Sequence, residues 1–273
     1  MAKMPTQPHP SSRAQPAPFR KTDKTKRGSI VVIYGPEGVG KTTLGAYASQ
    51  PKFILAPHET GLLTLYKYGL VPEREYAMPE SWDELLATVD AVDDCKVLVL
   101  DALGGFEQLC HEHVCRVEFD SDWGEKGFIG YQRGPKIAVQ TWQKLLQKLE
   151  TLRNRGISIL MLSHQQIRTI QNPLGPDYDR CVPQCNPNTW GITHKWADSV
   201  FFVTFLQRLE KTKGDRRMKG IGGNDRVAYA VGTDAWDAKN RFGMPEVFDI
   251  PNDPSKSWEA VRAAINGKGV NDA

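Results

Sequence analysis

The chain has 273 residues, of which 40% are hydrophobic and 25% charged, which suits one sizeable globular α/β domain or two small ones. It contains no run of 18 apolar residues, which excludes a membrane-spanning helix, and no apolar stretch near the N-terminus of the kind a secretory signal needs. We therefore expect a cytoplasmic protein with no membrane partner. Its five scattered cysteines argue against a disulfide framework.

The net charge of +3 is unevenly distributed. Residues 1–28 hold seven basic side chains and one acidic one, are rich in Pro, Ser and Gln, and have almost no large apolar residues. Such a segment cannot bury enough surface to offset its ordering entropy, so we expect a disordered basic tail. The tail either contacts nucleic acid phosphates or is a solubilising leader without a partner. Residues 267–273 are expected to be a flexible C-terminus.

Between residues 29 and 266, short apolar runs alternate with helical patterns. In chain order the sequence predicts a strand at 29–34, a helix at 41–50, a strand at 53–56, a helix after a capping box at Ser81 and Glu84, a strand at 96–100, a helix at 106–117, a loop at 120–135, a helix at 136–152, a strand at 157–162, a polar loop at 168–194, a strand at 199–206, its hairpin partner at 226–231 and a helix at 258–265.

This alternation predicts an α/β fold. Continuous apolar strands between helices are typical of a mostly parallel sheet covered on both faces, here with an antiparallel hairpin at one edge. Ligands of such sheets bind at the carboxyl ends of the strands. The candidate site residues follow the first four strands.

A G-x-x-x-x-G-K-T motif follows the first strand and opens a helix. In this context the backbone N–H groups cradle nucleotide phosphates, Lys41 reaches the β- and γ-phosphates, and the Thr42 hydroxyl coordinates Mg²⁺. The sequence therefore predicts an ATP site with Mg²⁺, formed by Gly35, Pro36, Glu37, Gly38, Val39, Gly40, Lys41, Thr42 and Thr43.

Polar residues follow three more strands. Asp101 ends the apolar strand at 96–100, where the acid associated with the Mg²⁺ ion is expected. Glu59 follows the strand at 53–56 and is the candidate base or water-orienting group, with an ordinary loop acid as the alternative. His164 follows the strand at 157–162 and is the candidate γ-phosphate contact, with Gln165 as its alternative. A polar residue at a strand end, with its hydrogen bonds satisfied within the fold and no role toward nucleotide, would also explain this position.

The order of these motifs resembles that of RecA-like ATPases, most closely the small phage and prophage ATPases of single-strand annealing and recombination, the ATPase branch of the Sak family. ILAPHETGLL occupies the place of the RecA catalytic glutamate, which puts that role on Glu59. ISILMLSHQQIRT resembles the RecA sensor strand and its DNA-binding loop, with His164 where phage members usually have histidine. The resemblance covers roughly residues 29–250 and implies a RecA-like ATPase domain over 29–266.

A last motif, AKNRFGMP, resembles the KNRFG motif of RadA-type recombination ATPases. In that family the basic residues act across a subunit boundary on the neighbour's ATP. The resemblance nominates Lys239 and Arg241 and implies a homo-oligomer, either a filament or a ring. The residues alone would fit a surface turn equally well.

Other clusters are weaker. Cys110 and Cys115, with Cys181 and Cys185, have spacings unlike common zinc sites, and a helix face explains the first pair. Trp123, Phe128 and Tyr131 either stack bases or anchor their loop to the core. The predicted hairpin tip at 208–219 has six basic residues against two acids and is either a DNA contact or a solvated loop.

We therefore expect an ATPase that acts on single-stranded DNA in recombination or annealing, with a single-strand DNA-binding protein as a further candidate partner. Two alternatives remain. One is a regulatory or assembly protein that binds nucleotide with little hydrolysis. The other is a P-loop kinase that phosphorylates a small molecule, a class that usually needs an arginine-bearing lid.

Overall fold

The computed structural model describes residues 27–211 and 218–267. The strands are β1 (Ile30–Gly35), β2 (Pro51–Leu55), β3 (Glu75–Ala77), β4 (Val97–Asp101), β5 (Ser158–Ile170), β6 (Tyr178–Pro183), β7 (Ser199–Lys211), β8 (Met218–Tyr229), β9 (Lys239–Asn240) and β10 (Val247–Ile250). The helices are α1 (Lys41–Ala46), α2 (Gly61–Lys67), α3 (Trp82–Asp90), α4 (Leu103–Glu118), the 3-10 turn η1 (Gly130–Gln132), α5 (Arg133–Asn154), α6 (Pro187–Trp196) and α7 (Pro254–Ile265).

The central sheet has the order β10-β8-β7-β1-β5-β4-β2-β3. The pairs from β7 to β3 along this order are all parallel, whereas β8 and β10 continue the sheet antiparallel. The expected mostly parallel sheet with an antiparallel hairpin towards one edge is therefore confirmed. Because β1 lies between β5 and β7, the loop that leaves β1 opens between the ends of those two strands.

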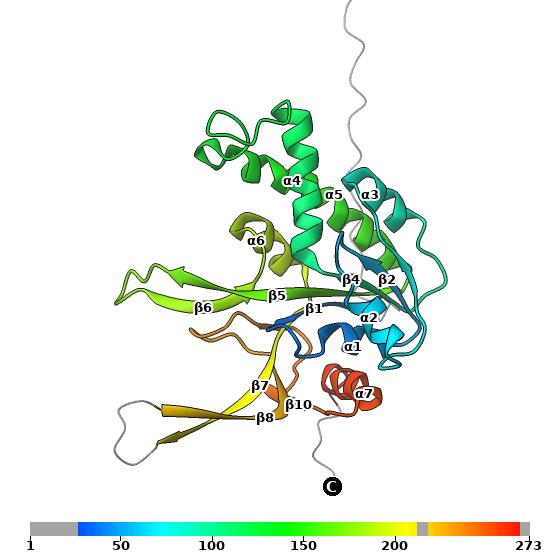
Figure 1. Ribbon diagram of the computed structural model, residues 1–273, viewed down its shortest axis with the longest axis vertical. Helices are drawn as coiled ribbons and strands as arrows, with labels where there is room; N and C mark the ends of the chain where they lie inside the picture. The colour runs from blue at the N-terminus through cyan, green and yellow to red at the C-terminus, as the bar shows by residue number, and fades with distance from the viewer. Residues whose placement is uncertain (1–26, 212–217, 268–273) are drawn as a thin grey trace, which may run out of the picture.

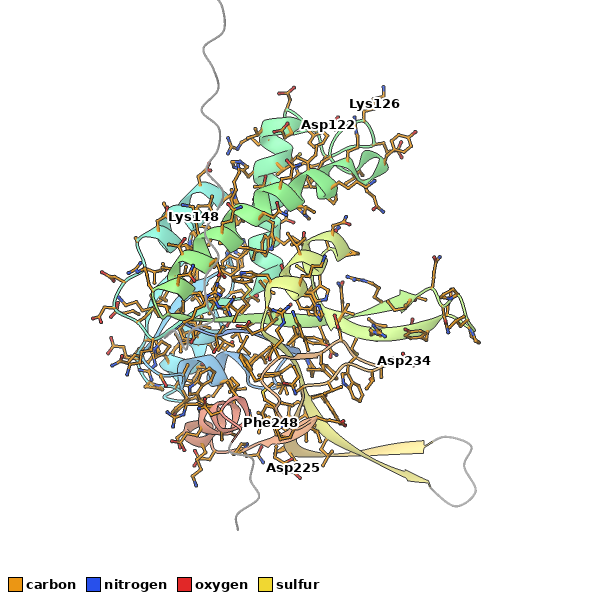
Figure 2. The ribbon with its side chains drawn as sticks, turned by 180° about the vertical axis from the view of Figure 1, so that it is seen from behind. Asp122, Lys126, Lys148, Asp225, Asp234 and Phe248 are labelled. Atoms are coloured by element: carbon orange, nitrogen blue, oxygen red, sulfur yellow. The ribbon has the colours of Figure 1, made fainter. Side chains whose placement is uncertain are left out.

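Helices cover both faces of this sheet (Figure 1). Alternate residues of β1 point to opposite faces. Ile30, Val32 and Tyr34 join the core under α3, α4, α5 and α6. Val31 and Ile33 join the core under α1, α2 and α7 on the other face. Figure 2, seen from behind, labels Phe248 of β10 near α7, and this partly buried ring packs against the second core through Phe201.

Local sequence signals explain where several helices begin and end. The Ser81 hydroxyl accepts the backbone N–H of Glu84 at 3.2 Å and caps α3, while the Glu84 carboxylate accepts the N–H of Glu80. This is a variant of the expected capping box, displaced by one residue. Helix α1 stops at Ala46, earlier than expected. Pro51 disfavours helical geometry at Gln50, so the chain turns into β2 instead.

The expectation of an irregular loop over residues 168–194 is wrong. Strand β5 runs on to Ile170 and pairs with β6 as a two-stranded arm, and α6 follows, with Asn186 as its cap and a proline in its first turn. The outer half of β5 is polar because this arm projects beyond the sheet and has no core to cover. It therefore lacks the apolar run that marks a buried strand.

A second arm is formed by β7 and β8, which remain paired out to Lys211 and Met218. Strand β1 ends at Gly35, opposite His164 of β5, while both neighbouring strands run further in the same direction. The two arms leave the same end of the sheet (Figure 1). The nucleotide motif therefore lies at the foot of both arms.

Candidate nucleotide site

The P-loop, residues 35–42, leaves a strand whose six residues are all buried. Gly38 and Gly40 adopt φ angles of 74° and 91°. These left-handed conformations strain side chains with a Cβ, so the motif glycines meet a backbone requirement at these two positions. Such a loop can turn successive N–H groups toward one anion, which is what a nucleotide phosphate needs.

Lys41 lies over the loop that precedes it. Its ammonium donates hydrogen bonds to the carbonyls of Gly35 at 3.0 Å and Pro36 at 2.9 Å. Burial lowers the pKa of Lys41, and the nearby Asp101, Glu37 and Glu59 oppose that shift. A partly desolvated cation held at the loop is well suited to bind phosphate oxygens.

Thr42, in the first turn of α1, and Asp101, at the carboxyl end of β4, form the expected pair. The Thr42 hydroxyl donates to Asp101 Oδ2 at 2.7 Å. Burial raises the pKa of Asp101 to about 6, and the bond from Thr42 acts in the opposite direction. A hydroxyl and a carboxylate supply the hard oxygen atoms that Mg²⁺ prefers, so these two residues fit the ion that accompanies ATP.

Glu59 and His164 meet at the same end of the sheet. Glu59 Oε1 lies 3.4 Å from His164 Nε2, although the residues come from the segment after β2 and from β5. The hydrogen bond to His164 lowers the pKa of Glu59, and the same bond raises the pKa of His164. His164 therefore faces Glu59, and its neighbour Gln165 points to the other face of β5.

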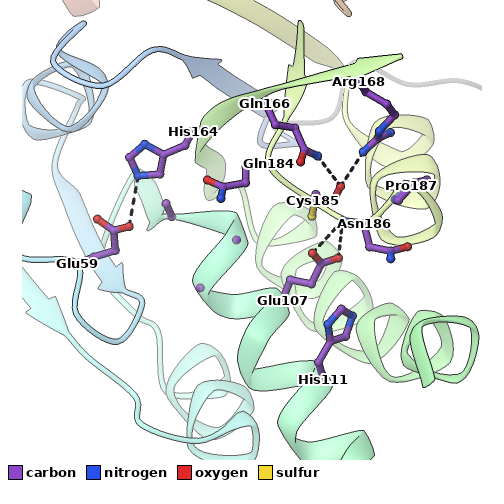
Figure 3. A pocket seen from close by; sticks show the side chains of 13 residues that line it. Glu59, Glu107, His111, His164, Gln166, Arg168, Gln184, Cys185, Asn186 and Pro187 are labelled. Atoms are coloured by element: carbon purple, nitrogen blue, oxygen red, sulfur yellow. Dashed lines mark hydrogen bonds and ion pairs between the residues drawn. The ribbon is translucent and has the colours of Figure 1, made fainter. Parts of the chain in front are cut away.

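A cavity of about 580 Å³ is lined by this pair and by no residue of the P-loop (Figure 3). Its walls come from the start of α4, from alternate residues of β5, and from the connection between β6 and α6. Gln166 and Arg168 both donate to the Cys185 carbonyl, at 3.0 and 2.8 Å. The Glu107 carboxylate accepts the Asn186 N–H through both oxygens. These bonds hold the base of the β5–β6 arm to the core.

The KNRFG segment, residues 239–243, lies elsewhere. Lys239 and Asn240 pair with Val200 and Ser199 at the start of β7, which lies beside the first half of β1 and not beside its P-loop end. The Lys239 ammonium donates to the carbonyls of His194, Lys195 and Ala197, at 2.5, 3.1 and 2.6 Å, and so caps the end of α6.

Arg241 is more available than Lys239. Its side chain is 53% exposed, donates to the Lys195 carbonyl at 3.2 Å and lies 3.9 Å from Asp198. Neither basic residue reaches the P-loop of its own chain. Their expected action on a neighbouring subunit stays a prediction.

The remaining candidates divide between the core and the surface. Phe128 is buried against Phe119 and Trp123, whereas Tyr131 is 93% exposed. Cys110 and Cys115 are buried in α4, and Cys110 donates to the Ala138 carbonyl. The described part of the chain contains no group of three or more metal-ligating side chains. The basic tail through residue 26 and the tip at 212–217 lie outside the described residues.

Sequence reasoning missed Gln166 and Arg168 at the cavity and Arg226 beside the P-loop. Gln166 and Arg168 share the face of His164 at a spacing of two, a pattern that could have revealed a longer strand. Arg226 of β8 donates to the Val39 carbonyl in the P-loop at 3.2 Å. No local pattern marks Arg226, because 187 residues separate the two groups.

In the residues that the structure describes, none of the helices combines the length and apolarity needed to cross a membrane. Among solved structures, the chain resembles the flagellar accessory protein FlaH from Methanocaldococcus jannaschii, with a TM-score of 0.43 and 12% identity over 82% of this chain and 86% of that one. A likeness of this size does not establish a shared activity. No curated protein matches the sequence significantly.

A protein-family model described as an AAA domain matches residues 27–242. The match includes the P-loop, Glu59, Asp101 and His164, and it ends within the KNRFG segment. Because it spans most of the chain and because the P-loop lies between a buried strand and a helix, the protein belongs to the AAA domain family and is a P-loop nucleoside triphosphatase.

Proposed function

We propose that the protein hydrolyses ATP with Mg²⁺ and couples hydrolysis to single-stranded DNA in recombination or annealing. The observation that carries the ATPase part is the meeting of four elements at one end of the sheet. Lys41 lies at the loop, Thr42 bonds Asp101, and Glu59 contacts His164. Cation, metal ligands and a candidate base for water are the groups that nucleotide hydrolysis requires.

The resemblance to phage recombination ATPases and the two arms beside the P-loop support the DNA part. The β5–β6 arm carries exposed apolar groups, Ile167 at 68% and Leu174 at 96% exposure. The sequence segment 208–219, of which residues 212–217 lie outside the described part, holds six basic residues. Exposed apolar side chains on a projecting arm and a basic sequence segment suit a flexible polyanion with exposed bases. The basic tail at 1–28 is a further candidate contact.

We also propose that the protein acts as a homo-oligomer, a filament or a ring, in which Arg241 reaches the neighbour's γ-phosphate. This proposal rests on the KNRFG resemblance and on the distance of that segment from its own P-loop. A cation supplied by a neighbour stabilises charge on the transferred phosphoryl group and makes hydrolysis depend on assembly. Lys239, which caps α6, would hold the segment in place.

The test is an ATPase assay with and without single-stranded DNA, over a range of protein concentrations and with Mg²⁺ or EDTA. We expect turnover that requires Mg²⁺, is stimulated by single-stranded DNA and rises faster than linearly with protein concentration. Hydrolysis that ignores DNA at every salt concentration would remove the DNA part. Binding of ATP without turnover would favour the regulatory or assembly role.

A small-molecule kinase is the second candidate, and one observation favours it. The cavity beside Glu59 and His164 has the volume of a metabolite site and polar walls. In a kinase, the phosphoryl acceptor would bind next to the γ-phosphate. Glu59 and His164, the two residues expected near the γ-phosphate, both line this cavity. Transfer of labelled γ-phosphate to a compound from a metabolite mixture would support the kinase against the DNA-dependent ATPase.

A further inference from the structure

Arg226 lies against the P-loop from a distant part of the chain. On β8 it pairs with Phe205 of β7 and Ile250 of β10, at the foot of the β7–β8 arm. Its neighbour Asp225 marks this place in Figure 2. One guanidinium nitrogen donates to the Val39 carbonyl at 3.2 Å, and the other donates to the Pro251 carbonyl.

The guanidinium packs tightly on the loop backbone. A Cβ built at Gly40 would lie 2.4 Å from Arg226 Nη1, a distance that real side chains do not adopt. The left-handed backbone of Gly40 is what requires glycine, and the absence of a Cβ leaves the guanidinium of Arg226 its place against the loop. An arginine in this setting keeps its charge, because a guanidinium does not lose its proton in proteins.

The bond to Val39 acts on a peptide unit that serves the phosphate site. The Val39 carbonyl and the Gly40 N–H belong to the same planar peptide group. A charged donor on the carbonyl oxygen polarises that group and makes its N–H a stronger donor, as in other chains of hydrogen bonds. In a P-loop the backbone N–H groups are the ones that bind phosphate oxygens.

We propose that Arg226 is a positioning residue for nucleotide, which strengthens phosphate binding through the Val39–Gly40 peptide group. The inference rests on the proposed binding of ATP at the P-loop, and it adds a residue that the P-loop motif does not contain. Arg226 acts from behind the loop. It should therefore affect how tightly ATP binds more than how fast bound ATP is hydrolysed.

The experiment compares Arg226→Gln and Arg226→Lys with the wild type in the full-length protein. Binding of a non-hydrolysable ATP analogue with Mg²⁺ is measured by calorimetry, and KM and kcat are measured in the ATPase assay. Arg74→Gln is the matched control. Arg74 also donates to a backbone carbonyl of this region, that of Ala46 at 2.7 Å, but at the far end of α1.

We expect Arg226→Gln to weaken binding of the analogue and to raise KM by about 10-fold, the scale of one charge-assisted hydrogen bond, with kcat nearly unchanged. Arg226→Lys keeps the charge but loses the forked guanidinium and should weaken binding by about 3-fold, and Arg74→Gln should match the wild type. Loss of kcat at constant KM, wild-type affinity in Arg226→Gln, or an equal loss in Arg74→Gln would overturn the inference.

Two further outcomes are also decisive. If Arg226→Gln does not fold, binding of the ATP analogue is measured on the folded Arg226→Lys protein. An affinity between those of the wild type and a Lys41→Ala protein then supports the inference. Wild-type affinity overturns it. If the wild type itself does not bind the analogue, the proposed ATP site fails and the inference fails with it. A wild type that binds ATP but is not stimulated by DNA leaves the inference about Arg226 standing.

Discussion

The two ends of the parallel sheet hold charged residues in different ways. At the carboxyl ends of β2 and β5, Glu59 and His164 line a cavity, and Lys41 and Asp101 lie near enough for their charges to interact with this pair. At the start of β7, Lys239 is bonded to three carbonyls, and Asp198 binds Arg153 at 2.6 Å. At the first end, charged side chains lie beside a cavity that could hold a ligand. At the second end, charged side chains bind the last carbonyls of α6 and join α5 to the segment before β7.

This comparison teaches that a basic motif in the sequence can have two components with different physical roles. Lys239 and Arg241 are two residues apart, yet Lys239 donates to three carbonyls at the end of α6, whereas Arg241 donates to one and stays half exposed. The three bonds occupy all the N–H groups of the Lys239 ammonium. The guanidinium of Arg241 keeps further N–H groups that a partner can reach. The predictions below test that difference and the contrast between the two ends.

The largest effect is expected from Lys41→Ala. This change removes the cation that lies over the loop, so nucleotide binding or turnover should be abolished. Binding of a fluorescent ATP analogue and an ATPase assay measure the effect, and Lys52→Ala, which alters an exposed ion pair with Glu75, is the control. Near-normal activity of Lys41→Ala would contradict the P-loop assignment.

A loss of about 10³-fold in hydrolysis is expected from Arg241→Gln in the assembled protein, with ATP binding kept, because a cation supplied by a neighbour is worth that much. Mixing Arg241→Gln with Lys41→Ala protein should restore part of the activity, since some interfaces then pair an intact P-loop with an intact arginine. A mixture without activity, together with a specific activity that does not depend on concentration, would rule out the trans role.

Glu59→Gln should keep ATP binding and slow hydrolysis by about 10²-fold, the scale of lost general-base catalysis. Single-turnover kinetics with pre-bound ATP separate the chemical step from binding. Glu112→Gln, an exposed acid on α4, is the matched control. If turnover is unchanged in Glu59→Gln, the base lies elsewhere and Asp101 is the next residue to test.

The pH dependence should be set by Asp101. Burial raises its pKa to about 6, so the carboxylate becomes protonated below that pH and loses its role toward Mg²⁺. We expect kcat/KM to fall about 10-fold for each pH unit below the pKa of Asp101. Because Mg²⁺ favours the ionised carboxylate, raising the Mg²⁺ concentration should shift this fall to lower pH. A fall whose position does not respond to Mg²⁺ would point to another group.

The smallest effect concerns Lys239. Lys239→Met removes a charged donor from the end of α6 and should lower the free energy of unfolding by about 2 kcal/mol. Denaturant unfolding measures this, and Arg241→Gln should change stability by less than about 0.5 kcal/mol. Equal destabilisation by both changes would contradict the distinction between Lys239, which stabilises the end of α6, and Arg241, which contributes little to stability.

Patterns confined to a few neighbouring residues were sufficient for much of the fold and site. The apolar run before Gly35 predicted β1, the motif glycines predicted the P-loop, and the end of the run at 96–100 predicted the position of Asp101. The run at 157–162 left His164 and Gln165 as alternatives, and the family resemblance favoured His164. Each signal works because strands buried on both faces read as continuous apolar runs. The outer half of β5, strand β6 and helix α6 were missed because an arm outside the core has no such run.

The sequence by itself determined that this protein has a P-loop, a mostly parallel sheet and acids at the ends of its strands, because each of these follows from local backbone and burial requirements. Only the tertiary structure decided that Glu59 faces His164, that Lys239 closes α6 and that Arg226 lies behind the P-loop. These contacts join residues from 42 to 187 positions apart. Distance along the chain leaves no pattern, so the packing of strands and helices is what brings such side chains together.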